Sequence, residues 1–186
     1  MNVVEALLNR VSVARLSEPA PDAAQREQLF AAAMRAPDHG QLRPWRFLTV
    51  EAEARNQLGE LFASALAVRE GDVKPEAIER ARNAPLRAPL LIVVIACVQA
   101  HPKVPAQEQI LAAACAAHGL LLAADALGFG AMWRTGDLAY DPVVAAGLGL
   151  ASHEQIIGFV YLGSSEGARR TPAPLALADY VQSWPA

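Results

Sequence analysis

The sequence has 186 residues, 53% of them hydrophobic, and a formal net charge of −3. This length suits one domain, residues 1–186, and leaves little room for a second core. The weak acidic charge, without a basic run, argues against nucleic acid or an anionic membrane as partner. The N-terminus lacks the basic-then-apolar order of a secretory signal, so we expect a cytoplasmic protein.

Two cysteines, Cys97 and Cys115, lie in apolar runs and form no C-x-x-C pair. They indicate neither a zinc site nor a disulfide framework, so we expect buried, reduced thiols and no metal site. The most apolar stretch runs from Ile110 to Ala124. It is shorter than the roughly 20 residues that a membrane-spanning helix needs.

Hydrophobic periodicity predicts helices and strands in alternation. Asp22 is a suitable N-cap for a helix ending near Ala36, with Leu29, Phe30, Ala33 and Met34 on its inner face. The expected helices cover residues 3–9, 23–36, 53–68, 75–83, 105–127 and 141–148, and the expected strands cover 45–51, 90–98, 130–134 and 156–163.

Two of these elements shape the expected architecture. Residues 90–98 form a continuous β-branched run, which is typical of a central strand covered on both faces. The segment 105–127 is apolar almost all round, so we expect a buried helix whose small residues let another helix approach, with His118 as a core histidine. The element order predicts a layered domain of helices and strands. The tail from Ser164 fits no core pattern and is expected to pack on another subunit.

Two short segments carry groups suited to phosphate. The first segment, residues 10–15, contains Arg10, Ser12 and Arg15. Guanidinium and hydroxyl groups are suitable donors to phosphate oxygens. Cations also suit an exposed helix end, and this alternative stays open. The segment 128–136 (GFGAMWRTG) places Arg134 between glycines whose backbone allows an anion to approach. A tight turn would explain these glycines but not Arg134.

The loop 34–46 (MRAPDHGQLRPWR) concentrates arginines, a histidine and prolines between a helix and a strand. Such a loop suits the polar edges of a flat aromatic ring, although ordinary surface loops hold the same residue types. The sequence has no P-loop, no G-x-G-x-x-G after a strand, no H-E-x-x-H and no G-x-S-x-G. Without the glycine motif, the sequence does not indicate a dinucleotide fold of the Rossmann type.

Taken in order, the motifs resemble the FMN-dependent nitroreductase family, in particular its small bacterial branch of NAD(P)H nitroreductases. The resemblance covers nearly the whole chain, and the ordered set is specific although each piece alone is weak. It rests on RVSVAR at 10–15, MRAPDHGQLRPWRF at 34–47, ARNAPLRAP at 81–89, HPKVP at 101–105, GFGAMWRTG at 128–136 and IIGFVYLG at 156–163.

The resemblance implies a three-layer α+β fold with a central mixed sheet flanked by helices, and an obligate homodimer with two FMN sites at its interface. The implied FMN phosphate ligands include Arg10, Ser12 and Arg134, while Arg35 and His39 reach the flavin from the partner subunit. The full set of implied FMN-binding positions is Arg10, Val11, Ser12, Arg35, His39, Trp133, Arg134 and Thr135. The stretch implied for the nicotinamide cofactor is Ala123, Ala124, Asp125, Ala126, Leu127 and Gly128.

The implied reaction carries hydride from NADH or NADPH through flavin N5 to a nitroaromatic, quinone or similar acceptor in a ping-pong sequence. No catalytic acid is identified. The alternatives are an FMN-binding or sensing module without turnover, and a related flavin reaction such as reductive dehalogenation. The chain departs from the family pattern at Val11, where a second arginine is usual, at Gly40, where a larger polar residue is usual, and at Arg43, where glutamine is usual.

Overall fold

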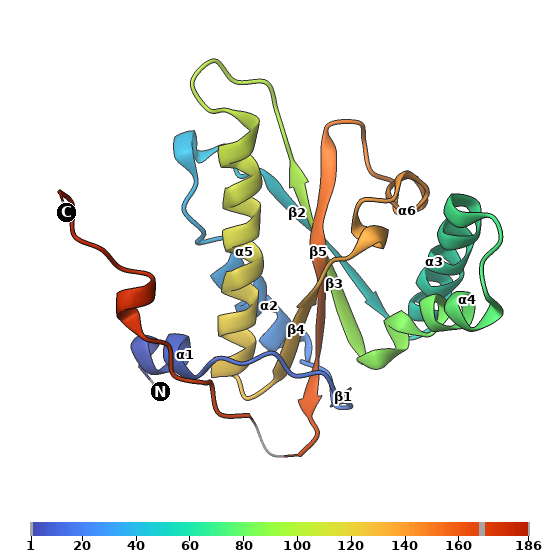
Figure 1. The fold of residues 1–186 in the computed structure, drawn as a ribbon, viewed down its shortest axis with the longest axis horizontal. Coiled ribbons are helices and arrows are strands. Elements are labelled where there is room, and N and C mark those ends of the chain that lie inside the picture. Colours follow the sequence, from blue (N-terminus) through green and yellow to red (C-terminus); the bar gives the residue numbers. More distant parts are fainter. Residues whose placement is uncertain (1, 168–169, 186) are drawn as a thin grey trace.

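The computed structural model describes residues 2–167 and 170–185. These residues form a five-stranded sheet with helices on both faces (Figure 1). The helices are α1 Val3–Asn9, α2 Ala23–Ala33, α3 Ala54–Glu70, α4 Pro75–Arg82, α5 Ala106–Ala126 and α6 Pro142–Gly147. The strands are β1 Leu16–Ser17, β2 Trp45–Glu51, β3 Leu90–Cys97, β4 Gly130–Arg134 and β5 Glu154–Ser165, and the 3-10 turns are η1 His39–Gln41, η2 Ala84–Arg87, η3 Asp137–Ala139 and η4 Leu177–Asp179.

Side-chain caps define where several helices begin. Asp22 accepts a hydrogen bond from the backbone nitrogen of Gln25 at 2.8 Å and starts α2, as the sequence predicts. The helix ends at Ala33, earlier than predicted, because Pro37 cannot continue it and the intervening residues form a tighter turn. Met34 therefore caps the helix and is exposed rather than part of the inner face.

The strand pairings correct one expectation about the sheet. Among the described strands, β1, β3 and β4 all pair antiparallel with β5, and β2 pairs antiparallel with β3, so the sheet is antiparallel and not mixed. The reason lies in the helices between β2 and β3, which return the chain to the end of the sheet where β2 stopped. Glu51, the last residue of β2, consequently lies opposite Leu90, the first residue of β3.

Two apolar clusters confirm the three layers and the central position of β3. Leu90, Ile92 and Val94 belong to the cluster with α2 and α5, and the alternate residues Leu91, Val93 and Ile95 belong to the cluster with α3 and α6. All six residues have no exposed surface. Successive side chains of a strand point to opposite faces, so a strand apolar throughout requires cover on both sides.

Helix α5 differs from its prediction because only one side of it is buried. Leu111, Cys115 and His118 are exposed, so the expectations of a core histidine and of a buried Cys115 thiol were wrong. The helix has 21 residues and is long and apolar enough to cross a membrane by length and composition, yet half of its most apolar stretch is buried inside the fold. A core helix facing a sheet has this pattern. Gly119 lies against the backbone of Ala33, where a β carbon would come within 3.3 Å of the Ala33 Cα, so α2 is the helix that approaches closely on the buried side.

The N-terminal loop runs beside β4. The backbone nitrogen of Val13 donates to the carbonyl oxygen of Ala131 at 3.0 Å, and the short strand β1, which the sequence did not predict, pairs Leu16 with Ser165 of β5. Gly130 accommodates this approach, because a β carbon there would lie 2.6 Å from the Leu16 side chain. The loop that carries Arg10 is thereby held at the edge of the sheet.

We predict that Gly59→Ala lowers the free energy of unfolding. In a free helix the change would raise stability by about 1 kcal/mol. Here the new β carbon would lie 2.1 Å from the carbonyl oxygen of Arg82, so α3 and α4 must separate. We expect a net loss of about 1–3 kcal/mol, measured by urea denaturation. The control is Ser64→Ala, at an exposed position of α3, which should leave stability unchanged or slightly higher. Equal stability of wild type and Gly59→Ala would contradict the close packing of the two helices.

Candidate functional site

The first candidate site is a small basic pocket at the edge of the sheet. Arg10, Val11 and Ser12 line a cavity of about 270 Å³ together with Arg170 and Thr171 of the C-terminal tail. Neither arginine forms an ion pair within the part of the chain that the structure describes. Two unpaired guanidinium groups and hydroxyl donors around one cavity suit an anion such as a phosphate.

Arg134 does not line this pocket. Its guanidinium carbon lies 5.4 Å from the centroid of the Tyr161 ring, and its buried Nε has no hydrogen-bond partner among the described residues. Burial raises the pKa of Tyr161, which the positive charge of Arg134 partly opposes. The structure therefore does not bring Arg10 and Arg134 of this chain into a common cavity, and a phosphate role for Arg134 stays a prediction.

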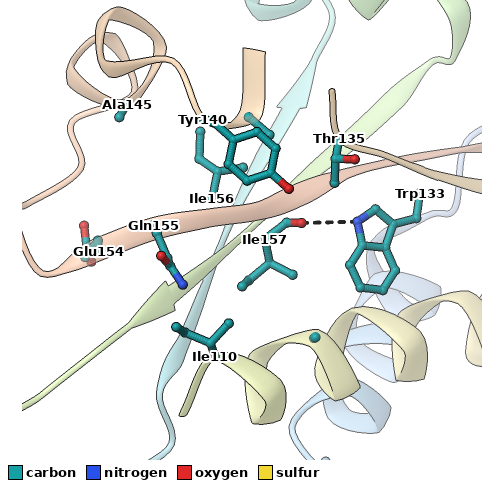
Figure 2. Close-up of a pocket in the computed structure, with 11 residues that line it drawn as sticks. Ile110, Trp133, Thr135, Tyr140, Ala145, Glu154, Gln155, Ile156 and Ile157 are labelled. Carbon is teal, nitrogen blue, oxygen red and sulfur yellow. Dashed lines mark hydrogen bonds between the residues drawn. The ribbon is translucent and has the colours of Figure 1, made fainter. Parts of the chain in front are cut away.

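The second candidate site is a cavity of about 510 Å³ along an open edge of β5 (Figure 2). Strand β4 ends with Arg134 opposite Phe159, so residues 154–158 of β5 pair with no strand on that edge within the described part of the chain. The residues that line this cavity are Ile110, Ala114, Trp133, Thr135, Ala139, Tyr140, Ala145, Glu154, Gln155, Ile156 and Ile157.

Trp133 has a fixed orientation at one side of this cavity. Its indole Nε1 donates to the carbonyl oxygen of Ile157 at 3.3 Å, as Figure 2 shows. The ring lies across Gly158, where a β carbon would come within 2.1 Å of the indole nitrogen. The absence of a side chain at Gly158 therefore makes the slot that holds the indole, and the ring offers a rigid aromatic wall.

Glu154 borders the same cavity and is held in its charged form. Arg46 donates to both of its oxygens, at 2.6 and 2.7 Å, and the Cys97 thiol lies 3.3 Å from Oε1. The hydrogen bonds from Arg46 are the main reason that the pKa of Glu154 falls to about 2, so the group is a carboxylate at neutral pH. Burial is the main reason that the pKa of Cys97 rises to about 11, which keeps this half-buried thiol protonated.

The loop with His39 is held in an unusual backbone conformation. Gly40 has φ 74°, which favours glycine, and the non-glycine residues Gln41 and Arg43 have φ 53° and 49°. The Arg43 backbone nitrogen donates to Asp38 Oδ2 at 2.6 Å, which helps to hold the turn. Such conformations concentrate at functional sites.

The side chain of His39 is exposed but oriented. Its Nδ1 lies 2.6 Å from a carboxylate oxygen of Glu108 at the start of α5. Arg35, which precedes His39 in the same loop, is also exposed. Neither His39 nor Arg35 lines the two cavities described above. In this chain neither predicted position lines a cavity with Arg10 or Trp133.

The stretch from Ala123 to Gly128, implied for the nicotinamide cofactor, is the end of α5 and its turn. Ala124 and Asp125 are buried, and the backbone nitrogens of Leu127, Gly128 and Phe129 donate to carbonyl oxygens of the preceding turn. The stretch lines neither cavity, and its assignment to a nicotinamide cofactor stays a prediction.

The structure adds residues that sequence reasoning missed. Arg170 and Thr171 belong to a tail that showed no core pattern, and the only signal was a basic pair soon after the last strand. Gly158 stood within the IIGFVYLG motif, but nothing in that motif showed that Trp133 would lie across it. The position of Tyr140 between α6 and the cavity has no local sequence signal.

Comparison with known proteins places the chain in a family. The sequence model of the Nitroreductase family matches residues 7–164. A candidate NAD(P)H nitroreductase, YdjA of Escherichia coli strain K12, is 42% identical over 166 residues, which cover 89% of this chain and 90% of that protein. A nitroreductase-like protein from Bacillus cereus superposes with a TM-score of 0.83 at 22% identity, covering 100% of this chain and 97% of the other. A candidate nitroreductase from Desulfovibrio desulfuricans, solved in complex with FMN, gives a TM-score of 0.76 at 21% identity over 100% and 99% of the two chains.

The chain therefore belongs to the nitroreductase family, and the resemblance drawn from its motifs is confirmed. The α+β fold is confirmed as well, because the solved structures match it over nearly their whole length. Membership identifies the protein as an oxidoreductase of the nitroreductase type.

We predict that the Arg46–Glu154 pair stabilises the fold above pH 4.5 and that this stabilisation is lost as the pH falls toward 2. The folded-state pKa of Glu154 is about 2, below the ordinary 4.5, so the unfolded chain takes up the proton first on acidification. Glu154→Gln should lower the free energy of unfolding by about 1–3 kcal/mol at pH 7, because Arg46 loses a charged partner.

Urea denaturation at pH 7, 4 and 3 measures this effect. The difference between wild type and Glu154→Gln should shrink as the pH falls. Glu27→Gln, at an exposed position of α2, is the control and should show no such change. A difference that stays constant from pH 7 to 3 would argue against the depressed pKa.

Proposed function

We propose that the protein is an FMN-dependent oxidoreductase that takes electrons from NADH or NADPH and passes them to a nitroaromatic, a quinone or a similar small acceptor. The observation that carries the proposal is the basic pocket of Arg10, Ser12 and Arg170. Three findings from the comparisons support it. The chain belongs to the nitroreductase family, the 42% identical relative is named as an NAD(P)H nitroreductase, and a structural neighbour was solved in complex with FMN.

The residues of the basic pocket fit the phosphate end of FMN. Arg10 and Arg170 bring two positive charges without competing carboxylates, and the hydroxyl of Ser12 adds a donor. Arg170 also compensates for Val11, the position where the family usually has a second arginine. The tail thus supplies a cation that the N-terminal loop lacks.

The residues of the larger cavity fit a flat ring system. Trp133 presents its fixed indole, Ile110 and Ile156 supply apolar contacts, and Thr135 and Gln155 supply polar groups at the edge. FMN, when bound, supplies the hydride chemistry between the nicotinamide and the acceptor. The chain's own role there is to bind, orient and shield the reactants.

Glu154 is the only carboxyl group among the described residues that line the cavity, and Arg46 holds it as a carboxylate, so it is not a proton donor at neutral pH. We assign the protons that accompany reduction of the acceptor to solvent. One cavity serving both substrates in turn leads to ping-pong kinetics.

We further propose a homodimer in which Arg35 and His39 of one protomer complete the cavity of the other. The support is a set of apolar side chains that one protomer leaves exposed on α1, α5 and the tail. They are Val3, Val4, Leu7, Leu8, Leu111, Leu175, Leu177, Tyr180, Val181 and Trp184. Exposed apolar surface of this extent marks a contact surface. A cytoplasmic location is consistent with this assignment.

Anaerobic titration of the purified protein tests the function. Protein loaded with FMN should be yellow and should be bleached by NADH or NADPH, and its colour should return on addition of a quinone. Yellow protein that neither nucleotide bleaches would instead indicate a flavin-binding module. Protein that does not bind FMN would disprove the proposal.

We predict that Arg10→Ala and Arg170→Ala each weaken FMN binding by about 10–100-fold, because a hydrogen bond between charged groups contributes about 1.5–3 kcal/mol. Quenching of FMN fluorescence on titration with apoprotein measures the dissociation constant. Arg80→Ala, at an exposed position of α4, is the matched control and should bind FMN like wild type.

A comparison with Arg134→Ala separates two locations for the phosphate. If Arg134→Ala lowers the affinity for FMN and Arg170→Ala leaves it unchanged, the phosphate lies beside Tyr161, and the basic pocket is ruled out.

A further inference from the structure

Tyr140 lies where two cavities meet. It lines the 510 Å³ cavity beside Trp133, and it also lines a second cavity of about 400 Å³ between α3 and α6. Among the described residues, no other is common to both linings. Figure 2 shows the Tyr140 ring over β5, on the side of the first cavity opposite Ile110.

The side chain of Tyr140 is free to move while its backbone is fixed. The residue is 78% exposed, and its hydroxyl forms no hydrogen bond within residues 2–167 and 170–185. Its backbone nitrogen donates to the Asp137 carbonyl oxygen at 3.0 Å, and the following residue, Asp141, caps α6 through the Val143 nitrogen at 2.8 Å. Arg69 of α3 lies 3.4 Å from Asp137 and 4.0 Å from Asp141, which ties the turn to α3.

We propose that Tyr140 is a movable wall that sets the size of the electron acceptor. In the position that the structure shows, its ring closes the first cavity on the side of α3. Rotation of the ring breaks no hydrogen bond and joins the two cavities into one cleft, since the opposite wall, Trp133, is held by Ile157 and Gly158. Exposed side chains change rotamer within nanoseconds, so the opening is rapid compared with turnover.

The second cavity favours acceptors with an additional apolar ring. Ala65, Val68, Pro142 and Val143 line it, and Arg69 is paired with aspartates at its border. A one-ring quinone or nitrobenzene occupies the first cavity alone, whereas a naphthoquinone reaches past Tyr140 onto this apolar surface. This inference rests on the proposed function for the identity of the reacting group, but the binding preference can be measured without turnover.

The test uses the holoprotein and compares p-benzoquinone with a naphthoquinone. Tyr140→Ala should raise the ratio of kcat/KM for the two-ring over the one-ring acceptor by about tenfold, the scale of discrimination that a small apolar volume provides. Tyr140→Phe keeps the wall and should keep the wild-type ratio. Val68→Trp, at an exposed position of α3, fills the second cavity and should cancel the gain when combined with Tyr140→Ala.

Calorimetric titration of the oxidised protein with 2-naphthol and phenol gives a second measurement that needs no activity. Tyr140→Ala should raise the ratio of the affinity for 2-naphthol to the affinity for phenol by a similar factor. Unchanged ratios in Tyr140→Ala, or equal changes in Tyr140→Phe, would overturn the inference. A wild-type protein that binds both phenols but is not reduced by NADH or NADPH would refute the proposed function, and the binding ratios alone would then decide the role of Tyr140.

Discussion

The site depends on the way β5 pairs with its neighbours. β3 covers one edge of β5 along most of its length, while β4 and β1 share the other edge and leave its first residues uncovered. The uncovered edge borders the larger cavity, and the paired part of that edge holds the loop with Arg10 through β4. A single strand therefore positions both candidate cavities, and a shift in its register would displace both.

Small residues and ion pairs then shape the cavity. Gly158 leaves the space in which the Trp133 indole lies, and the Arg46–Glu154 pair fixes the start of β5 while removing Glu154 from proton chemistry. The cavity consequently has one fixed wall, at Trp133, and few reactive side chains. This composition suits an enzyme of a family in which a cofactor performs the chemistry and the protein provides binding and orientation.

Much of the candidate site could be predicted from motifs, but its assembly could not. The sequence pointed to Arg10, Ser12 and Trp133, and the structure places each of them at a cavity. It also suggested a clamp between Arg10 and Arg134. Neighbouring residues of a strand face opposite sides of the sheet, so Trp133 and Arg134 diverge, and Arg170 of the distant tail joins Arg10 instead.

The sequence by itself determined most helices and strands, because periodicity, caps and prolines act locally. Asp22 caps the start of α2, and the apolar run of β3 requires two covering layers. The sequence also determined the family, through six motifs in order. Only the tertiary structure decided the antiparallel pairing, the exposed face of α5, and the meeting of the tail with the N-terminal loop. These features depend on contacts between residues far apart in the chain, and no local pattern of side chains encodes them.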